Sequence, residues 1–133
     1  MASPMPSGQA TPAAGGDTCA GTRLLTSANG FLEVRGVSRD AEVWGLLFME
    51  APFARGREVK IVWRMTGEGP LRVSAVLPGG KRTQPIWLED HGGSTWQRPG
   101  YEWGTGWKFP KAGCWKIELT RTRGSGHVWL RVR

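Results

Sequence analysis

Short segments in which apolar and polar residues alternate run through most of this chain, with turn residues between them. Residues 57–66 alternate most cleanly, with large apolar side chains at every second position: Val59, Ile61, Trp63 and Met65. Successive side chains of a β-strand point to opposite faces, so this pattern predicts a strand with one buried face. Residues 71–77 repeat the pattern after a Gly-rich turn, which predicts another strand of the same kind.

The longest apolar run covers residues 43–49. Both faces of a strand here would be apolar, which is typical of a strand that is covered on each side or that changes partner at Gly45. Residues 22–25 and 31–34 are weaker strand candidates before this run. The N-terminal half therefore predicts short strands around one central buried strand.

The C-terminal half continues in the same way but contains a long interruption. Residues 83–88 predict an edge strand, because Pro85 has no backbone N–H to donate to a neighbour. Residues 89–105 are mixed, aromatic and rich in glycine, and they predict a long loop. Two more alternating strands are then expected, with inward side chains at these positions: Trp115, Ile117, Leu119, Val128, Leu130 and Val132.

These patterns predict an all-β fold. About seven to nine short strands, bounded by turns and with a tryptophan on the third long one, favour an immunoglobulin-like antiparallel β-sandwich, and a small closed barrel is the alternative. A chain of 133 residues with 39% hydrophobic content fits one domain. Residues 1–16 carry no charged side chain and are rich in Ala, Gly, Pro and Ser, so they predict a disordered leader or linker before a domain at residues 17–133.

The chain has two cysteines, Cys19 and Cys114. Buried free thiols are one interpretation, but both cysteines lie at predicted element edges rather than inside an apolar stripe, which favours a disulfide. Closing a loop of this length would stabilise the fold by about 4 kcal/mol. No apolar run reaches the length of a membrane span, and the leader lacks the basic start and apolar core of a signal peptide. We expect an exported domain whose signal segment is not in this sequence; a cytoplasmic protein with a disordered tail is the alternative.

Few residues suggest catalysis or metal binding. Asp90, His91 and Ser94 have the residue types of a hydrolase triad, but no nucleophile elbow accompanies them. The carboxylates of Glu89, Asp90 and Glu102 could supply a glycosidase-like pair, although no pattern supports one. The two histidines lack zinc-ligand spacing. The sequence therefore predicts a protein that is not an enzyme and has no cofactor or metal.

Aromatic residues of the predicted loop are one candidate binding site, because loops on a rigid sandwich often carry the binding residues. Their flat faces could stack on sugar rings, and the members are Trp96, Tyr101, Trp103 and Trp107 in segment 96–107. The alternative is that these side chains fold back over the core.

A basic sheet face is the second candidate site. The net charge is +7, and residues 108–133 contain seven Lys or Arg and one acid. If the strand at residues 57–66 lies beside the last two strands, one outward face holds Lys60, Arg64, Lys116, His127, Trp129, Arg131 and Arg133. Such a face would attract envelope polyanions, whereas nucleic acid is unlikely because no recognition motif is present. The alternative is a solvated face that protects a sheet edge from aggregation.

The sequence around the second cysteine resembles a family. The Phe-Pro-x-x-Gly-Cys-Trp motif at residues 109–115, followed by an alternating strand, resembles uncharacterised bacterial exported and lipoprotein domains with an immunoglobulin-like sandwich. The resemblance implies that Cys19 and Cys114 pair and that the domain is extracytoplasmic, secreted or lipid-anchored; it implies no activity. We therefore expect a non-enzymatic binding or structural module at a bacterial cell surface with a protein or envelope polymer partner. A carbohydrate-binding module that uses the aromatic loop, or an accessory subunit of a secreted complex, is the alternative.

Overall fold

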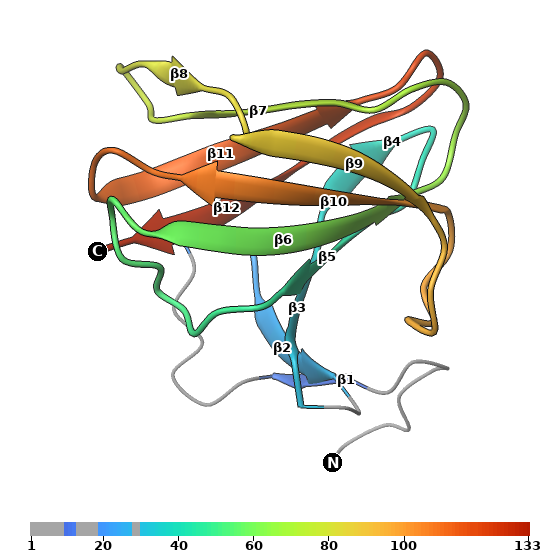
Figure 1. The fold of residues 1–133 in the computed structure, drawn as a ribbon, viewed down its shortest axis with the longest axis horizontal. Helices are drawn as coiled ribbons and strands as arrows, with labels where there is room; N and C mark the ends of the chain where they lie inside the picture. The colour runs from blue at the N-terminus through green and yellow to red at the C-terminus, as the bar shows by residue number, and fades with distance from the viewer. Residues whose placement is uncertain (1–9, 13–18, 28–29) are drawn as a thin grey trace.

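The computed structural model describes residues 10–12, 19–27 and 30–133, which form two antiparallel β-sheets packed face to face (Figure 1). In spatial order, the seven-stranded sheet contains β1 (Ala10–Pro12), β2 (Leu24–Ser27), β3 (Leu32–Arg35), β5 (Val43–Leu47), β6 (Glu58–Met65), β10 (Tyr101–Lys108) and β9 (Trp87–Gly92). The five-stranded sheet contains β4 (Val37–Arg39), β12 (Ser125–Val132), β11 (Gly113–Thr120), β7 (Arg72–Val76) and β8 (Arg82–Thr83). The prediction of an all-β, antiparallel two-sheet fold is confirmed, and the immunoglobulin-like topology stays a prediction.

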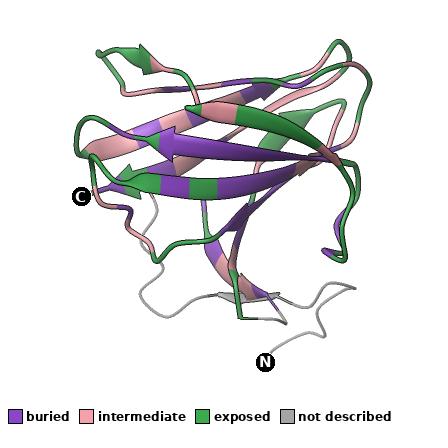
Figure 2. Ribbon diagram, in the orientation of Figure 1, coloured by how far each residue is buried: buried purple, intermediate pink, exposed green. Residues whose placement is uncertain are grey.

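The core lies between the two sheets and contains the residues that the alternating pattern placed inward. On β6, Ile61, Trp63 and Met65 are fully buried. They pack in one cluster with inward residues of the five-stranded sheet, including Ala75, Ile117 and Leu119. The long strands alternate between buried and less buried residues (Figure 2). The local period of two therefore predicted the residues that face the core, but not the burial of Val62 on the outward face of β6, where it packs with Trp96.

The central strand β5 is buried at every position, as the apolar run predicted. Val43 and Leu47 belong to the core between the sheets. Trp44 and Leu46 point to the outward face of the seven-stranded sheet, where the loop at residues 93–100 covers them with Trp96. The prediction that this apolar strand is covered on each side is therefore confirmed.

The predicted loop at residues 89–105 is wrong. Most of it belongs to β9 and β10, which pair with each other, and β10 also pairs with β6. Glycines at residues 104 and 106 resembled turn residues, but they lie inside β10, which Figure 2 shows as almost continuously buried. Residues 83–88 were predicted to form one edge strand, but they contribute to two strands. Near Pro85 the chain passes from β8 in one sheet to β9 in the other.

The structure contains more strands than the seven to nine expected. Strands β1, β4 and β8 have only two or three residues each, which is too short for alternation to be visible. β1 pairs with β2, so regular pairing begins inside the segment predicted as a leader. The other residues of that leader, 1–9 and 13–16, lie outside the described residues.

Cys19 and Cys114 form a disulfide with a Cα–Cα distance of 5.9 Å, which confirms the predicted pairing. Cys114 is in β11, and three residues after Cys19 the hydroxyl of Thr22 accepts a hydrogen bond from the backbone N–H of Trp129 in β12, at 3.0 Å. The chain then enters β2 in the other sheet. The bridge therefore ties Cys19, which lies in the chain between β1 and β2 of the seven-stranded sheet, to the five-stranded sheet. No helix long and apolar enough to cross a bilayer occurs within the described ranges.

Candidate functional site

The outward face of the five-stranded sheet carries a row of polar side chains that crosses four strands. Directly paired residues of antiparallel strands lie on the same face of a sheet. The pairs Arg39 with Ser125, Ser125 with Thr120, and Thr120 with Arg72 connect β4, β12, β11 and β7. We call these four residues the basic row. It has an arginine at each end and two hydroxyls between them.

The two arginines of the basic row are exposed and distant from each other. Neighbouring strands are about 4.8 Å apart, so three spacings separate the backbones of Arg39 and Arg72 by about 14 Å. Within the part of the chain that the structure describes, neither guanidinium forms an ion pair. Both are therefore available to an anion approaching this face.

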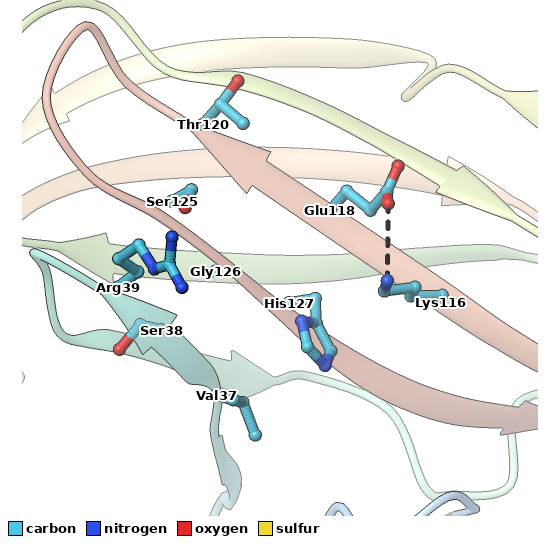
Figure 3. Close-up of a pocket in the computed structure, with 9 residues that line it drawn as sticks. All are labelled: Val37, Ser38, Arg39, Lys116, Glu118, Thr120, Ser125, Gly126 and His127. Atoms are coloured by element: carbon cyan, nitrogen blue, oxygen red, sulfur yellow. Dashed lines mark ion pairs between the residues drawn. The ribbon is translucent and has the colours of Figure 1, made fainter.

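Three members of the row, Arg39, Ser125 and Thr120, line a shallow hollow of about 460 Å³ (Figure 3). Its lining comes from β4, β11 and β12, and includes Arg39, Lys116, Glu118 and His127. Burial lowers the pKa of the His127 imidazole, and the nearby Lys116 ammonium lowers it further, while Glu118 opposes the shift. His127 is therefore neutral at pH 7 and gains charge only under more acidic conditions.

Positive charge dominates this face. The strands of the five-stranded sheet contain five Lys or Arg and one acid, Glu118. Arg82 donates to the Glu118 carboxylate at 2.6 Å, and the Lys116 ammonium lies 3.6 Å from it. The hydrogen bond from Arg82 lowers the pKa of Glu118 despite partial burial. The single acid of the face is therefore already paired, and the surplus charge is positive.

The predicted basic face is partly wrong in its membership. Lys116, His127, Trp129 and Arg131 do share the outward face, since they occupy same-facing positions of β11 and β12. Lys60 and Arg64 do not, because β6 pairs with β5 and β10 in the other sheet.

The remaining predicted members lie elsewhere and have other contacts. The Lys60 ammonium lies 4.7 Å from the centre of the Phe48 ring, and Arg64 is bonded to Glu102. Arg133 follows the end of β12 and lines a different hollow beside Phe48 and Phe53. Arg39, Arg72 and Arg82 also belong to the face, although the sequence pattern did not predict their membership. The alternation of β7 placed Arg72 outward, but no local signal showed which strands lie next to it.

The aromatic segment 96–107 does not form an exposed cluster. Trp103 and Trp107 point inward from β10 and are 6% and 0% exposed. Trp96 packs on the other side of the seven-stranded sheet and is 8% exposed. Tyr101 alone of the four is exposed, and its hydroxyl donates to Asp90, which raises the pKa of Tyr101. The alternative interpretation, in which the aromatic side chains pack against the protein, therefore holds for Trp96, Trp103 and Trp107.

A buried ion pair anchors the loop at residues 93–100 on the seven-stranded sheet. The guanidinium of Arg98 donates to the Glu33 carboxylate at 2.8 Å, and the same oxygen accepts the indole N–H of Trp96 at 3.0 Å. The Arg98 guanidinium also lies 3.7 Å from the centre of the Trp44 ring. Glu33 and Arg98 are both buried, so these contacts fix the inner side of the loop to the seven-stranded sheet.

Two of the residues considered for catalysis, Ser94 and His91, contact the carboxylate of a third, Glu102. Ser94 donates to it at 2.7 Å, Arg64 donates at 3.0 Å, and Nδ1 of His91 lies 3.1 Å away. Burial raises the pKa of Glu102, but these three hydrogen bonds outweigh it and hold the pKa below the ordinary value. The Ser94 hydroxyl is directed to the carboxylate and not to His91, so the arrangement lacks the nucleophile and base contact of a hydrolase.

Comparisons with protein-family models, curated proteins and solved structures give no match to this chain. The resemblance of residues 109–115 to exported domains therefore stays a prediction. Among residues 10–12, 19–27 and 30–133, no group of three or more His, Cys, Asp or Glu side chains is placed to hold a metal ion.

Proposed function

We propose that this protein is a non-enzymatic, extracytoplasmic module that binds an anionic polymer of the bacterial cell envelope. The binding surface is the outward face of the five-stranded sheet. The observation that carries the proposal is the basic row, in which two arginines flank two hydroxyls across four strands and form no ion pair with any residue that the structure describes. The disulfide supports the extracytoplasmic location, because such bonds persist mainly in oxidising compartments.

The spacing of the row favours a polymer over a single small anion. The backbones of the two arginines are about 14 Å apart, so each guanidinium can contact a different phosphate group of one chain. A chain with repeated negative charges that crosses the strands can contact Arg39, the two hydroxyls and Arg72 in succession. Arginine suits this role because its planar donor group matches phosphate and carboxylate oxygens.

Replacing both arginines of the row should weaken binding to a soluble poly(glycerol phosphate) by about tenfold, since each exposed charge contact contributes up to about 1 kcal/mol. The variant is Arg39→Ala with Arg72→Ala, and titration calorimetry measures its Kd. The matched control is Arg55→Ala with Arg57→Ala, which removes the same charge from exposed residues outside the five-stranded sheet. Equal losses in the two double variants would mean that only net charge matters, and this result would contradict the assigned face.

The same interaction should depend strongly on salt. The Debye length falls from about 10 Å at 0.1 M to about 3 Å at 1 M ionic strength, so contacts at an exposed face are screened. We expect the affinity for poly(glycerol phosphate) to decrease steadily over this range. Binding that does not change with salt would reject an electrostatic mechanism.

Binding should also become tighter in mild acid. Because the pKa of His127 is lowered, the imidazole is neutral at pH 7 and becomes cationic as the pH falls below its ordinary value of about 6.5. The added charge lies in the hollow that the basic row partly lines and attracts the polymer, by up to about fivefold in Kd. Glu118 remains ionised over this range because its pKa is lowered. Between about pH 8 and pH 5, the Kd should fall in the wild type and stay unchanged in His127→Gln.

A further inference from the structure

The outward face of the seven-stranded sheet has a feature that the polyanion proposal does not use. Strand β10 has glycine at two successive outward positions, Gly104 and Gly106. A Cβ atom at Gly106 would lie 2.1 Å from Nε1 of Trp87, and one at Gly104 would lie 2.6 Å from Cε1 of His91. Both separations are far below van der Waals contact, so only glycine permits these two rings to rest on the strand.

Hydrogen bonds hold the two rings in place. Trp87 starts on the edge strand β9 and extends over β10, where its Nε1 donates to Glu58 of β6 at 3.3 Å. His91 is fixed by its contact with Glu102. The indole of Trp87 remains partly exposed although Gly106 covers its inner side. Its open face is therefore directed away from the sheet in a fixed orientation.

From this geometry we infer that Trp87 forms a platform on which a neutral, β-linked hexose oligosaccharide stacks. A pyranose ring with equatorial hydroxyls presents a flat C–H face that matches an indole, and its hydroxyls need polar partners at the rim. Exposed charged side chains surround the platform: Glu58, Lys60, Glu89 and Lys108. Because acids and bases are balanced here, unlike on the basic face, a neutral glycan is the better match than a polyanion.

The platform is independent of the proposed function, since the two surfaces are the outward faces of different sheets. It also differs from the aromatic segment considered from the sequence. Trp87 lies outside residues 96–107, and three of the four aromatic residues in that segment are buried. In the sequence, the sign of this site is the Gly-x-Gly pattern at residues 104–106. Two glycines on one face of a strand leave room for aromatic rings, so the pattern does not mark a turn here.

Calorimetry with two probes, the β-1,4-linked tetrasaccharides of glucose and of N-acetylglucosamine, tests the proposal. The wild type should bind at least one of them, and Trp87→Ala should lower that affinity by at least about tenfold. Gly106→Ala should have a similar effect, because the added methyl group displaces the indole without removing it. Trp87→Phe retains a flat ring and should bind within about threefold of the wild type.

Two controls separate this site from the basic face. Trp129→Ala removes a partly buried tryptophan from the opposite sheet and should leave saccharide binding unchanged. The Arg39→Ala, Arg72→Ala variant should also bind the saccharide normally, while Trp87→Ala should bind poly(glycerol phosphate) normally. If Trp87→Ala does not fold, Gly106→Ala and Trp87→Phe decide the result. The proposal is overturned if the wild type binds neither tetrasaccharide, or if binding persists in Trp87→Ala or, when that variant does not fold, in Gly106→Ala.

Discussion

Replacing both cysteines of the disulfide with serine should reduce the free energy of unfolding by about 4 kcal/mol. The bridge joins residues 95 positions apart, so it removes a large amount of conformational freedom from the unfolded chain. It also positions the segment from Cys19 to Thr22 against β11 and β12 in the folded state. Both effects disappear in the Cys19→Ser, Cys114→Ser variant.

Urea denaturation of the wild type and the double variant, each with and without reductant, measures this loss. Reductant should lower the stability of the wild type to that of the variant and should leave the variant unchanged. The single variants should resemble the double variant, because either change removes the whole bridge. A wild type that keeps its midpoint under full reduction would show that the crosslink contributes little.

Replacing Arg98 with leucine should destabilise the fold by about 3 to 5 kcal/mol, the range seen when one partner of a buried ion pair is removed. Glu33 is 1% exposed, so its carboxylate would keep the indole N–H of Trp96 as a partner but lose its countercharge. The loop at residues 93–100 would also lose the contact between Arg98 and the Trp44 ring.

Two further variants identify the cause of that loss. Adding Glu33→Gln to Arg98→Leu removes the unpaired charge and should restore part of the stability. Arg35→Leu is the matched control on the same sheet, because Arg35 is an exposed residue whose ion pair with Glu42 is 3.8 Å long. Such surface pairs contribute at most about 1 kcal/mol. If Arg98→Leu costs no more than Arg35→Leu in chemical denaturation, the buried pair has no special role.

The long strands could be predicted from the sequence, whereas β10 could not. Val59, Ile61 and Trp63 alternate with less apolar residues, so their burial follows from the period of a strand. In β10, Gly104 and Gly106 occupy the outward positions, and they suggested a loop because glycine is common in turns. Their actual role depends on Trp87 and His91, which come from a neighbouring strand.

The candidate site was likewise predictable from the sequence only in part. Alternation placed Lys116, His127 and Arg72 outward on their own strands, and the structure agrees. It could not show that Arg39 completes the row from β4, a strand of three residues. It also could not show that Lys60 lies on the opposite sheet, since that depends on which strand pairs with β6.

The sequence by itself determined the all-β class, the inward and outward faces of the long strands and the pairing of the two cysteines. These properties depend on local periodicity and on having only two thiols in the chain. Only the tertiary structure decided which strands share a sheet, and with this the membership of the basic row and the position of the Trp87 platform. The physical reason is that backbone hydrogen bonds between strands are nearly the same for every pair of strands. Strand order is therefore selected by packing across the whole core, which no short segment of sequence contains.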